Sequence, residues 1–220
     1  RHRDPTALVG APLVGGAPPL WAIPFAASHD ALPGHLGQGM AYYALAYSLR
    51  PRVCVVVGSG AGFVPALVRR GQVDGGMVSG KTYFVDLQIM TPGKRLLGLP
   101  AAIPDDFLAA FPEIDFLRMR STPDAVDRLQ EHAVEVDYLF LDGDHTYEGV
   151  KRDLLGFRPL LSPRAVVLLH DSDEHVDASV GTRRLLAELR EDPCWDATAI
   201  PATNPHTGCG FAILKYLCKD

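Results

Sequence analysis

The sequence predicts an α/β protein with a doubly wound, mostly parallel seven-stranded sheet, helices on both faces and a C-terminal antiparallel hairpin. Short apolar or β-branched runs alternate with helix-like segments about five times along the chain. Strands that are joined through helices pair in parallel, and the helices cover both faces of the sheet. Two further strand-like runs close the chain without a helix between them, which predicts the hairpin.

Local patterns define the elements. Helical spacing of apolar residues predicts the first helix, Pro104 with two acids marks the start of another, and Thr122 before a proline caps a third. The predicted helices are residues 38–50, 62–71, 104–111, 122–132, 147–157 and 182–190. The predicted strands are residues 53–57, 82–87, 116–120, 136–142, 165–171, 195–201 and 210–216.

Composition limits the class of protein. Residues 1–37 are rich in glycine and proline and are expected to form a partly irregular arm or lid before a single domain at residues 38–220. The net charge of -5 argues against nucleic-acid binding through a basic surface, and no apolar run is long enough to span a membrane. The four cysteines lack Cys-x-x-Cys spacing, which favours a reduced, cytoplasmic protein with Cys54 as a buried thiol. The apolar residues of this arm are consistent with a subunit interface, and so with a homodimer.

A glycine-rich turn follows the first predicted strand. Gly58, Gly60 and Gly62 stand directly after the run of valines. A dinucleotide-binding turn would have its third glycine at position 63, which is Phe63 here, so a nicotinamide cofactor is disfavoured. The turn suits a ligand whose amino-acid part and ribose cross the loop without a pyrophosphate. Asp86, which ends the next strand, can accept both hydroxyls of a ribose, although an aspartate there can also simply cap a turn.

Acidic residues and a histidine follow the fourth and fifth predicted strands. Asp142, Asp144 and His145 come at the end of one apolar run, and Asp171 ends the next. Parallel strands end at the same edge of a sheet, where ligands bind. Buried charge is unfavourable unless it is paired or bound. These side chains therefore predict a cationic or reactive site, unless the strand ends are solvated.

The segments VVVGSGAG, YFVDL and DYLFLDGDHTYEGVKRDLLGFRPLLSPRAVVLLHD, with the closing hairpin, occur in a characteristic order. Together they resemble class I S-adenosylmethionine-dependent methyltransferases, which have a Rossmann-like fold. The long segment resembles macrocin-type sugar and small-molecule O-methyltransferases, and residues 37–63 resemble the catechol type. The resemblance covers residues 37–216. One departure is Val56, where the family often has an acid that contacts the cofactor's amino-acid end.

The resemblance implies a cofactor, an acceptor and a set of binding residues. The cofactor is S-adenosylmethionine, and the acceptor is a hydroxyl of a small molecule of sugar or natural-product type, with no nucleic-acid or membrane partner. The implied cofactor-binding residues are Gly58, Ser59, Gly60, Gly62, Asp86, Ser121, Thr122, Asp142, Gln38 and Met40. Gln38 and Met40 are expected in a lid over the cofactor, and helix surface and core are the alternative for both.

The resemblance also implies a metal site and a catalytic base. Asp142 and Asp171 match positions that hold Mg²⁺ in metal-dependent members, with Ser172 at the partner position and Asp144, Asp173 or water needed to complete the site. The alternative is that these acids cap strand ends and no metal is used. His145 stands where catechol-type enzymes have a lysine base, and it is expected to act with Asp142 in catalysis. A histidine that merely starts a helix is the alternative.

Two other functions remain open from the sequence. One is a protein of the same fold that binds S-adenosylmethionine but performs no catalysis, or a repurposed one. The other, less favoured, is an NAD-dependent oxidoreductase.

Overall fold

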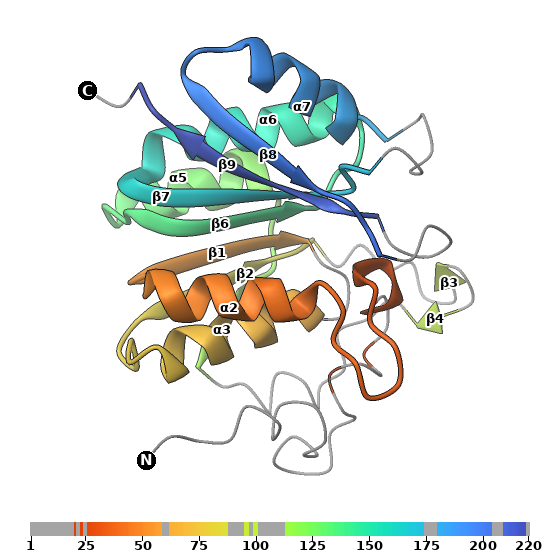
Figure 1. Ribbon diagram of the computed structural model, residues 1–220. Helices are drawn as coiled ribbons and strands as arrows, with labels where there is room; N and C mark the ends of the chain where they lie inside the picture. Colours follow the sequence, from red (N-terminus) through yellow and green to blue (C-terminus); the bar gives the residue numbers. More distant parts are fainter. Residues whose placement is uncertain are drawn as a thin grey trace.

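The computed structural model describes residues 20, 23, 26–58, 62–87, 95–96, 99–100, 113–173, 180–203 and 209–218. Within these ranges a seven-stranded sheet has the order β5-β2-β1-β6-β7-β9-β8 (Figure 1). All neighbours from β5 to β7 pair in parallel, and β9 is antiparallel to both β7 and β8. The predicted fold class is therefore confirmed. The strands are β1 (Val53–Gly58), β2 (Lys81–Val85), β5 (Ile114–Leu117), β6 (Val136–Asp142), β7 (Leu161–His170), β8 (Trp195–Ile200) and β9 (Phe211–Tyr216).

Helices cover both faces of the sheet. The described helices are η2 (Ala26–His29), α2 (Gly39–Leu49), α3 (Phe63–Asp74), η3 (Ser121–Ala125), α5 (Val126–Glu131), α6 (Tyr147–Phe157), η4 (Arg158–Leu160) and α7 (Thr182–Glu191). Helices α2 and α3 lie on one side, and α5, α6 and α7 lie on the other (Figure 1). A separate pair of short strands, β3 (Arg95–Leu96) and β4 (Leu99–Pro100), is antiparallel. The predicted helix at 104–111 lies outside the described residues.

The central strands alternate between two hydrophobic cores. In β6, Tyr138 and Phe140 face the core that includes α2 and α3, whereas Leu139 and Leu141 face the core that includes α6 and α7. All residues from 136 to 141 are buried. A strand that is buried on both faces favours apolar residues on both, which explains the apolar run at residues 138–141. The buried Asp137 accepts hydrogen bonds from the Arg52 backbone and the Ser162 hydroxyl.

Two predicted strands differ from the structure by three residues or more at one end, and the other strand ends differ by at most two. The third strand was expected at residues 116–120 but lies at Ile114–Leu117, where it pairs with β2. The fifth begins at Leu161 rather than at residue 165, because Leu161 pairs with Val136 before an irregularity in the register.

The described part of the N-terminal arm is packed on the sheet rather than loose. Leu20, Ile23, Ala26 and Leu36 are buried in the same core as α2 and α3. Residues 26–29 form a helical turn that ends at the buried His29. The arm therefore places the His29 side chain near Asp142, at the carboxyl end of β6.

The cysteines correct one prediction. Cys194 and Cys218 form a disulfide, although all four thiols were expected to be reduced. The pairing follows from the hairpin, because Trp195 lies opposite Tyr216 and the two cysteines flank this pair. Disulfides are uncommon in a reducing compartment, and the cytoplasmic location stays a prediction. Cys54 is buried, as predicted, and burial raises the pKa of its thiol. Among the described helices, none is long and apolar enough to cross a membrane.

Candidate active site

A cavity of about 660 Å³ opens at the carboxyl ends of β1, β2 and β6. This is the edge at which parallel α/β sheets bind ligands. The predicted site residues that line it are Gly58, Asp86, Ser121, Thr122, Asp142, Asp144 and His145. Ser59 and Gly60 lie outside the described residues. The structure thus gathers residues that are far apart in the sequence around one cavity.

Gly58 allows β1 and β6 to end side by side. It pairs with Asp142 across the two strands and has a φ of 73°, a conformation that favours glycine. A side-chain Cβ at this position would overlap the backbone carbonyl of Asp142. Gly62 also has a positive φ, of 97°, and immediately precedes α3. Both glycines are therefore required by the backbone, which agrees with the tight turn predicted from the sequence.

The segment after β5 also lines the cavity. Ser121 and Thr122 line it, together with Arg120. The hydroxyl of Ser121 donates a hydrogen bond to Asp153 on α6, at 2.7 Å. That bond ties the loop to the helix layer and holds the wall in place.

Gln38 and Met40 do not line the cavity. Gln38 is buried and hydrogen-bonds to Asp30 and Tyr42, whereas Met40 is exposed on α2. The structure therefore places neither side chain in the expected lid.

Asp142, Asp171 and two histidines form a continuous polar cluster beside the cavity. His170 Nδ1 lies 2.9 Å from Asp142 Oδ1 and 3.2 Å from Asp171 Oδ1. His145 Nδ1 pairs with the other oxygen of Asp171. The side chain of His145 is 50% exposed, whereas that of Asp171 is 9% exposed. His145 therefore lines the cavity, and the buried carboxylate of Asp171 fixes the orientation of its imidazole.

The electrostatics of the cluster follow from these contacts. Burial lowers the pKa of His170, but Asp142 and Asp171 outweigh it and raise the pKa to about 10. Burial raises the pKa of Asp171, but hydrogen bonds from His145 and His170 bring it well below its ordinary value. The hydrogen bond to Asp171 raises the pKa of His145. The two buried carboxylates thus favour the protonated forms of His145 and His170.

The donor set does not fit Mg²⁺. Mg²⁺ prefers six oxygen ligands in near-octahedral geometry. The carboxylate of Asp144 accepts from Thr146 and pairs with Arg152, so it caps the start of α6. Ser172 lines a different cavity. Of the four predicted ligands, only Asp142 and Asp171 come together, and their oxygens face histidines.

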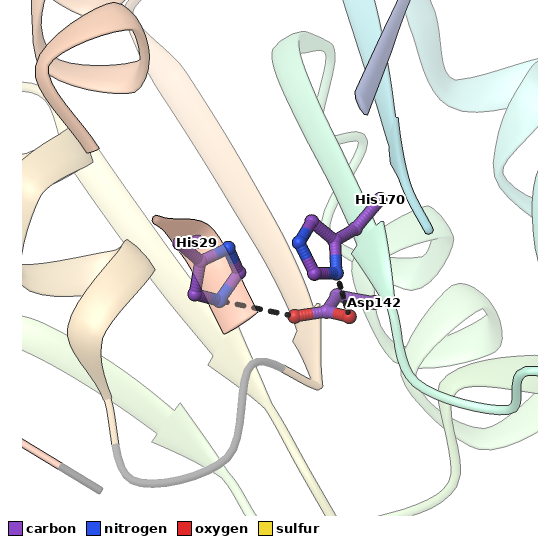
Figure 2. Close-up of side chains that lie close together, drawn as sticks. All are labelled: His29, Asp142 and His170. Carbon is purple, nitrogen blue, oxygen red and sulfur yellow. Dashed lines mark hydrogen bonds and ion pairs between the residues drawn. The ribbon is translucent and has the colours of Figure 1, made fainter. Parts of the chain in front are cut away.

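His29 and His170 also belong to the cluster, although neither is among the site residues named from the sequence. His29 comes from η2, Asp142 ends β6 and His170 ends β7, and the three side chains converge (Figure 2). His170 precedes Asp171 in the sequence, and this adjacency was a usable signal. His29 stands in the glycine- and proline-rich arm, where no motif marks it.

A methyltransferase domain family model matches residues 55–172 of the chain. An O-methyltransferase from Bacillus cereus, solved in complex with SAH, is similar in structure, with a TM-score of 0.65, 16% identity and coverage of 86% of this chain and 83% of that one. The O-methyltransferase TomG from Streptomyces achromogenes, involved in tomaymycin synthesis and solved with SAM, has a TM-score of 0.65 and 17% identity, covering 93% and 92% of the two chains. At these identities the likeness shows the fold.

One curated relative is similar over a short segment. The uncharacterized protein y4gI of Sinorhizobium fredii is 40% identical over 57 residues. This segment is 26% of the present chain and 6% of the relative. The chain therefore matches only a small part of that protein's length.

Proposed function

The chain belongs to the methyltransferase domain family, and on that premise we propose that it transfers a methyl group from S-adenosylmethionine to a hydroxyl of a small molecule. The acceptor class that we propose is a sugar or a natural-product scaffold. The observation that carries the proposal is the single cavity that unites Gly58, Asp86 and Asp142 with His145. The complexes of the similar O-methyltransferases with SAM and SAH support the choice of cofactor.

The walls of the cavity supply the groups that the cofactor needs. Asp86 offers a carboxylate at the end of β2 that can accept both ribose hydroxyls. Ser121 and Thr122 lie on the wall where the adenine is expected. Gly58 lines the cavity at the end of β1, where the amino-acid part is expected. When bound, the cofactor supplies a methyl group on a positively charged sulfur.

His145 is the proposed general base. In the neutral form of His145, Asp171 accepts the proton of Nδ1, and Nε2 has a lone pair that can take the proton of the acceptor hydroxyl. The resulting oxygen nucleophile attacks the methyl carbon in line with the carbon–sulfur bond, which breaks. Orientation of the imidazole by a buried carboxylate is a common way to prepare such a base. Mg²⁺ assistance, the alternative means of activating the hydroxyl, has less support because of the donor set.

Turnover tests the proposal. Incubation with S-adenosylmethionine and a panel of sugars and phenolic natural products is expected to give a methylated product and S-adenosylhomocysteine, both detected by mass spectrometry. His145→Ala is expected to lower kcat by at least about 100-fold with little change in cofactor affinity. His132→Ala, at an exposed histidine after α5, is the matched control. A loss of only a few-fold in His145→Ala would reject the base.

A non-catalytic role is the second candidate. It is favoured by the valine at position 56, where the family often has an acid. Cofactor binding without S-adenosylhomocysteine formation for any acceptor would support this candidate over methyl transfer.

A further inference from the structure

His170 lies between two buried carboxylates beside the cavity. Its Nδ1 is 2.9 Å from Asp142 Oδ1 and 3.2 Å from Asp171 Oδ1, and Figure 2 shows the first of these contacts. The side chains of His170, Asp142 and Asp171 are 2%, 7% and 9% exposed. Buried carboxylates that lie side by side repel each other unless a donor or a cation joins them. Both partners of Nδ1 are acceptors, so this nitrogen has the proton that joins the two acids.

The rest of the His170 side chain is held by packing. Its Nε2 is buried and has no hydrogen-bond partner among the described residues, so the polar contacts found for the ring are those of Nδ1. The ring centroid lies 4.2 Å from that of His29 and 6.3 Å from that of Phe140. The backbone of His170 is still part of the sheet, where it pairs with Phe211 of β9. With its ring and backbone fixed, His170 determines where the two carboxylates lie.

Asp171 connects His170 to the proposed base. Its Oδ1 faces His170, and its Oδ2 pairs with Nδ1 of His145. Successive side chains of a strand point to opposite faces, but Asp171 directly follows β7 with a φ of 59°, a left-handed conformation that interrupts the extended backbone. Its carboxylate can therefore lie beside the histidine that precedes it. A shift of His170 would in turn shift the carboxylate that orients His145.

We propose that His170 is a positioning residue that takes the place of a divalent ion. The resemblance described above implies that metal-dependent members hold Mg²⁺ at the positions of Asp142 and Asp171. In this chain an N–H group of His170 joins the same two acids, and it fixes the carboxylate that orients His145 without a metal ion. The consequence, methyl transfer that needs no metal, rests on the proposed function, whereas the bridge itself does not.

A competing arrangement would place a metal ion on the cavity side of the cluster. Asp142, His145 and Asp171 each offer one donor atom within 4.8 Å of the others. However, His145 and Asp171 are already in direct contact, and Oδ1 of each aspartate is turned to His170. The contacts therefore favour the imidazole bridge, and the response to Mg²⁺ separates the two arrangements.

Thermal unfolding of the chelator-treated full chain, with and without Mg²⁺, tests the bridge. The melting temperature of the parent protein is expected to change by less than about 1 °C in about 10 mM Mg²⁺. His170→Ala leaves two buried carboxylates without the N–H group, so this variant is expected to melt lower and to regain at least about 3 °C with Mg²⁺. A parent protein that Mg²⁺ stabilises, or a His170→Ala variant that responds no more than the parent, would overturn the bridge.

Leu168 provides a matched control for lost packing. It is fully buried in β7, two residues before His170, and it contacts neither carboxylate in the described cluster. Leu168→Val is expected to lower the melting temperature and to gain less than about 1 °C from Mg²⁺. An equal gain in Leu168→Val and His170→Ala would show that the response belongs to any weakened form of the protein, and it would overturn the assignment.

Two amide variants test the nitrogen that makes the bridge, and they decide the question if His170→Ala does not fold. The side-chain amide of asparagine reaches about as far from the backbone as Nδ1 of histidine, and that of glutamine about as far as Nε2. His170→Asn is therefore expected to melt at least about 3 °C above His170→Gln in chelator. Equal melting temperatures would contradict the role of Nδ1.

Turnover in the presence of chelator connects the bridge to the reaction. The parent protein is expected to keep its full kcat, and His170→Ala to lose about 10-fold to 100-fold because His145 is no longer oriented. His170→Asn is expected to recover most of this loss, and Leu168→Val to match the parent. Loss of parent activity on chelation would overturn the metal-free role. If no acceptor is methylated but the melting temperatures follow the pattern above, the proposed function fails and the bridge stands.

Discussion

Replacing Gly58 by alanine should damage both the fold and the cavity, and Gly34 provides a matched control. Both glycines have a positive φ, of 73° and 79°. An added Cβ at Gly58 would overlap the Asp142 carbonyl, whereas nothing lies within 4 Å of an added Cβ at Gly34. The two substitutions therefore share the backbone strain and differ in the steric clash.

The magnitude follows from these two effects. Left-handed backbone strain costs about 1–2 kcal/mol for alanine, and lower entropy of the unfolded chain offsets about 0.4–1 kcal/mol of it. We expect Gly34→Ala to lower the free energy of unfolding by about 1 kcal/mol. Overpacking at Gly58 adds about 1–3 kcal/mol, for a total of about 2–4 kcal/mol. The displaced end of β6 should also weaken S-adenosylmethionine binding at least about 10-fold in Gly58→Ala only.

Urea unfolding measures the first effect, and calorimetric titration measures the second. Equal loss of stability in the two variants would show that β1 and β6 do not approach as closely as described. Unchanged cofactor affinity in a folded Gly58→Ala variant would show that the ligand lies elsewhere.

Three further predictions concern affinity, pH and the disulfide. Asp86→Asn should weaken S-adenosylmethionine binding about 10-fold to 100-fold by calorimetry, because it removes a charged acceptor for the ribose, and unaltered affinity would reject that role. Burial raises the pKa of Asp137, but hydrogen bonds from Ser162 and Arg52 outweigh it and lower the pKa, so its stabilisation is present above the unfolded pKa and is lost as pH falls through the folded pKa. Asp137→Asn should therefore cost about 1–3 kcal/mol in urea unfolding at pH 7 and much less near pH 2, and an equal loss at both would contradict this account. Reduction of the disulfide, whose cysteines are 24 residues apart, should lower the free energy of unfolding by about 3 kcal/mol, and no change would indicate that the bond does not form.

The sheet could be predicted because its signals are local. The central strands are buried on both faces, so they contain continuous apolar runs, at residues 53–57 and 138–141, that differ from the helical spacing around them. Asp86 and Asp142 could be placed at one edge because parallel strands end together. The start of β7 could not be predicted from the local pattern, since Leu161 joins the strand through its pairing with Val136.

The cluster around Asp142 could not be predicted in full, because it depends on contacts between distant segments. His29 lies in an arm whose composition indicates irregular structure, and only tertiary packing brings it to Asp142. Gln38 was expected in a lid, but its amide is used to connect Asp30 to Tyr42.

The disulfide was missed for a related reason. Cysteine spacing along the chain contains no signal for it, because the pairing depends on the register of β8 with β9. In the β8–β9 hairpin, Cys194 and Cys218 lie next to each other at the open end, where they can form a disulfide.

The most direct test of the central claim is calorimetric titration of the purified chain with S-adenosylmethionine and, separately, with NAD. The cavity described here predicts one S-adenosylmethionine bound per chain, with affinity in the micromolar range or tighter, and no heat from NAD. Binding of NAD, or no binding of S-adenosylmethionine, would contradict the proposed function and the roles assigned to Asp86, Asp142 and His145.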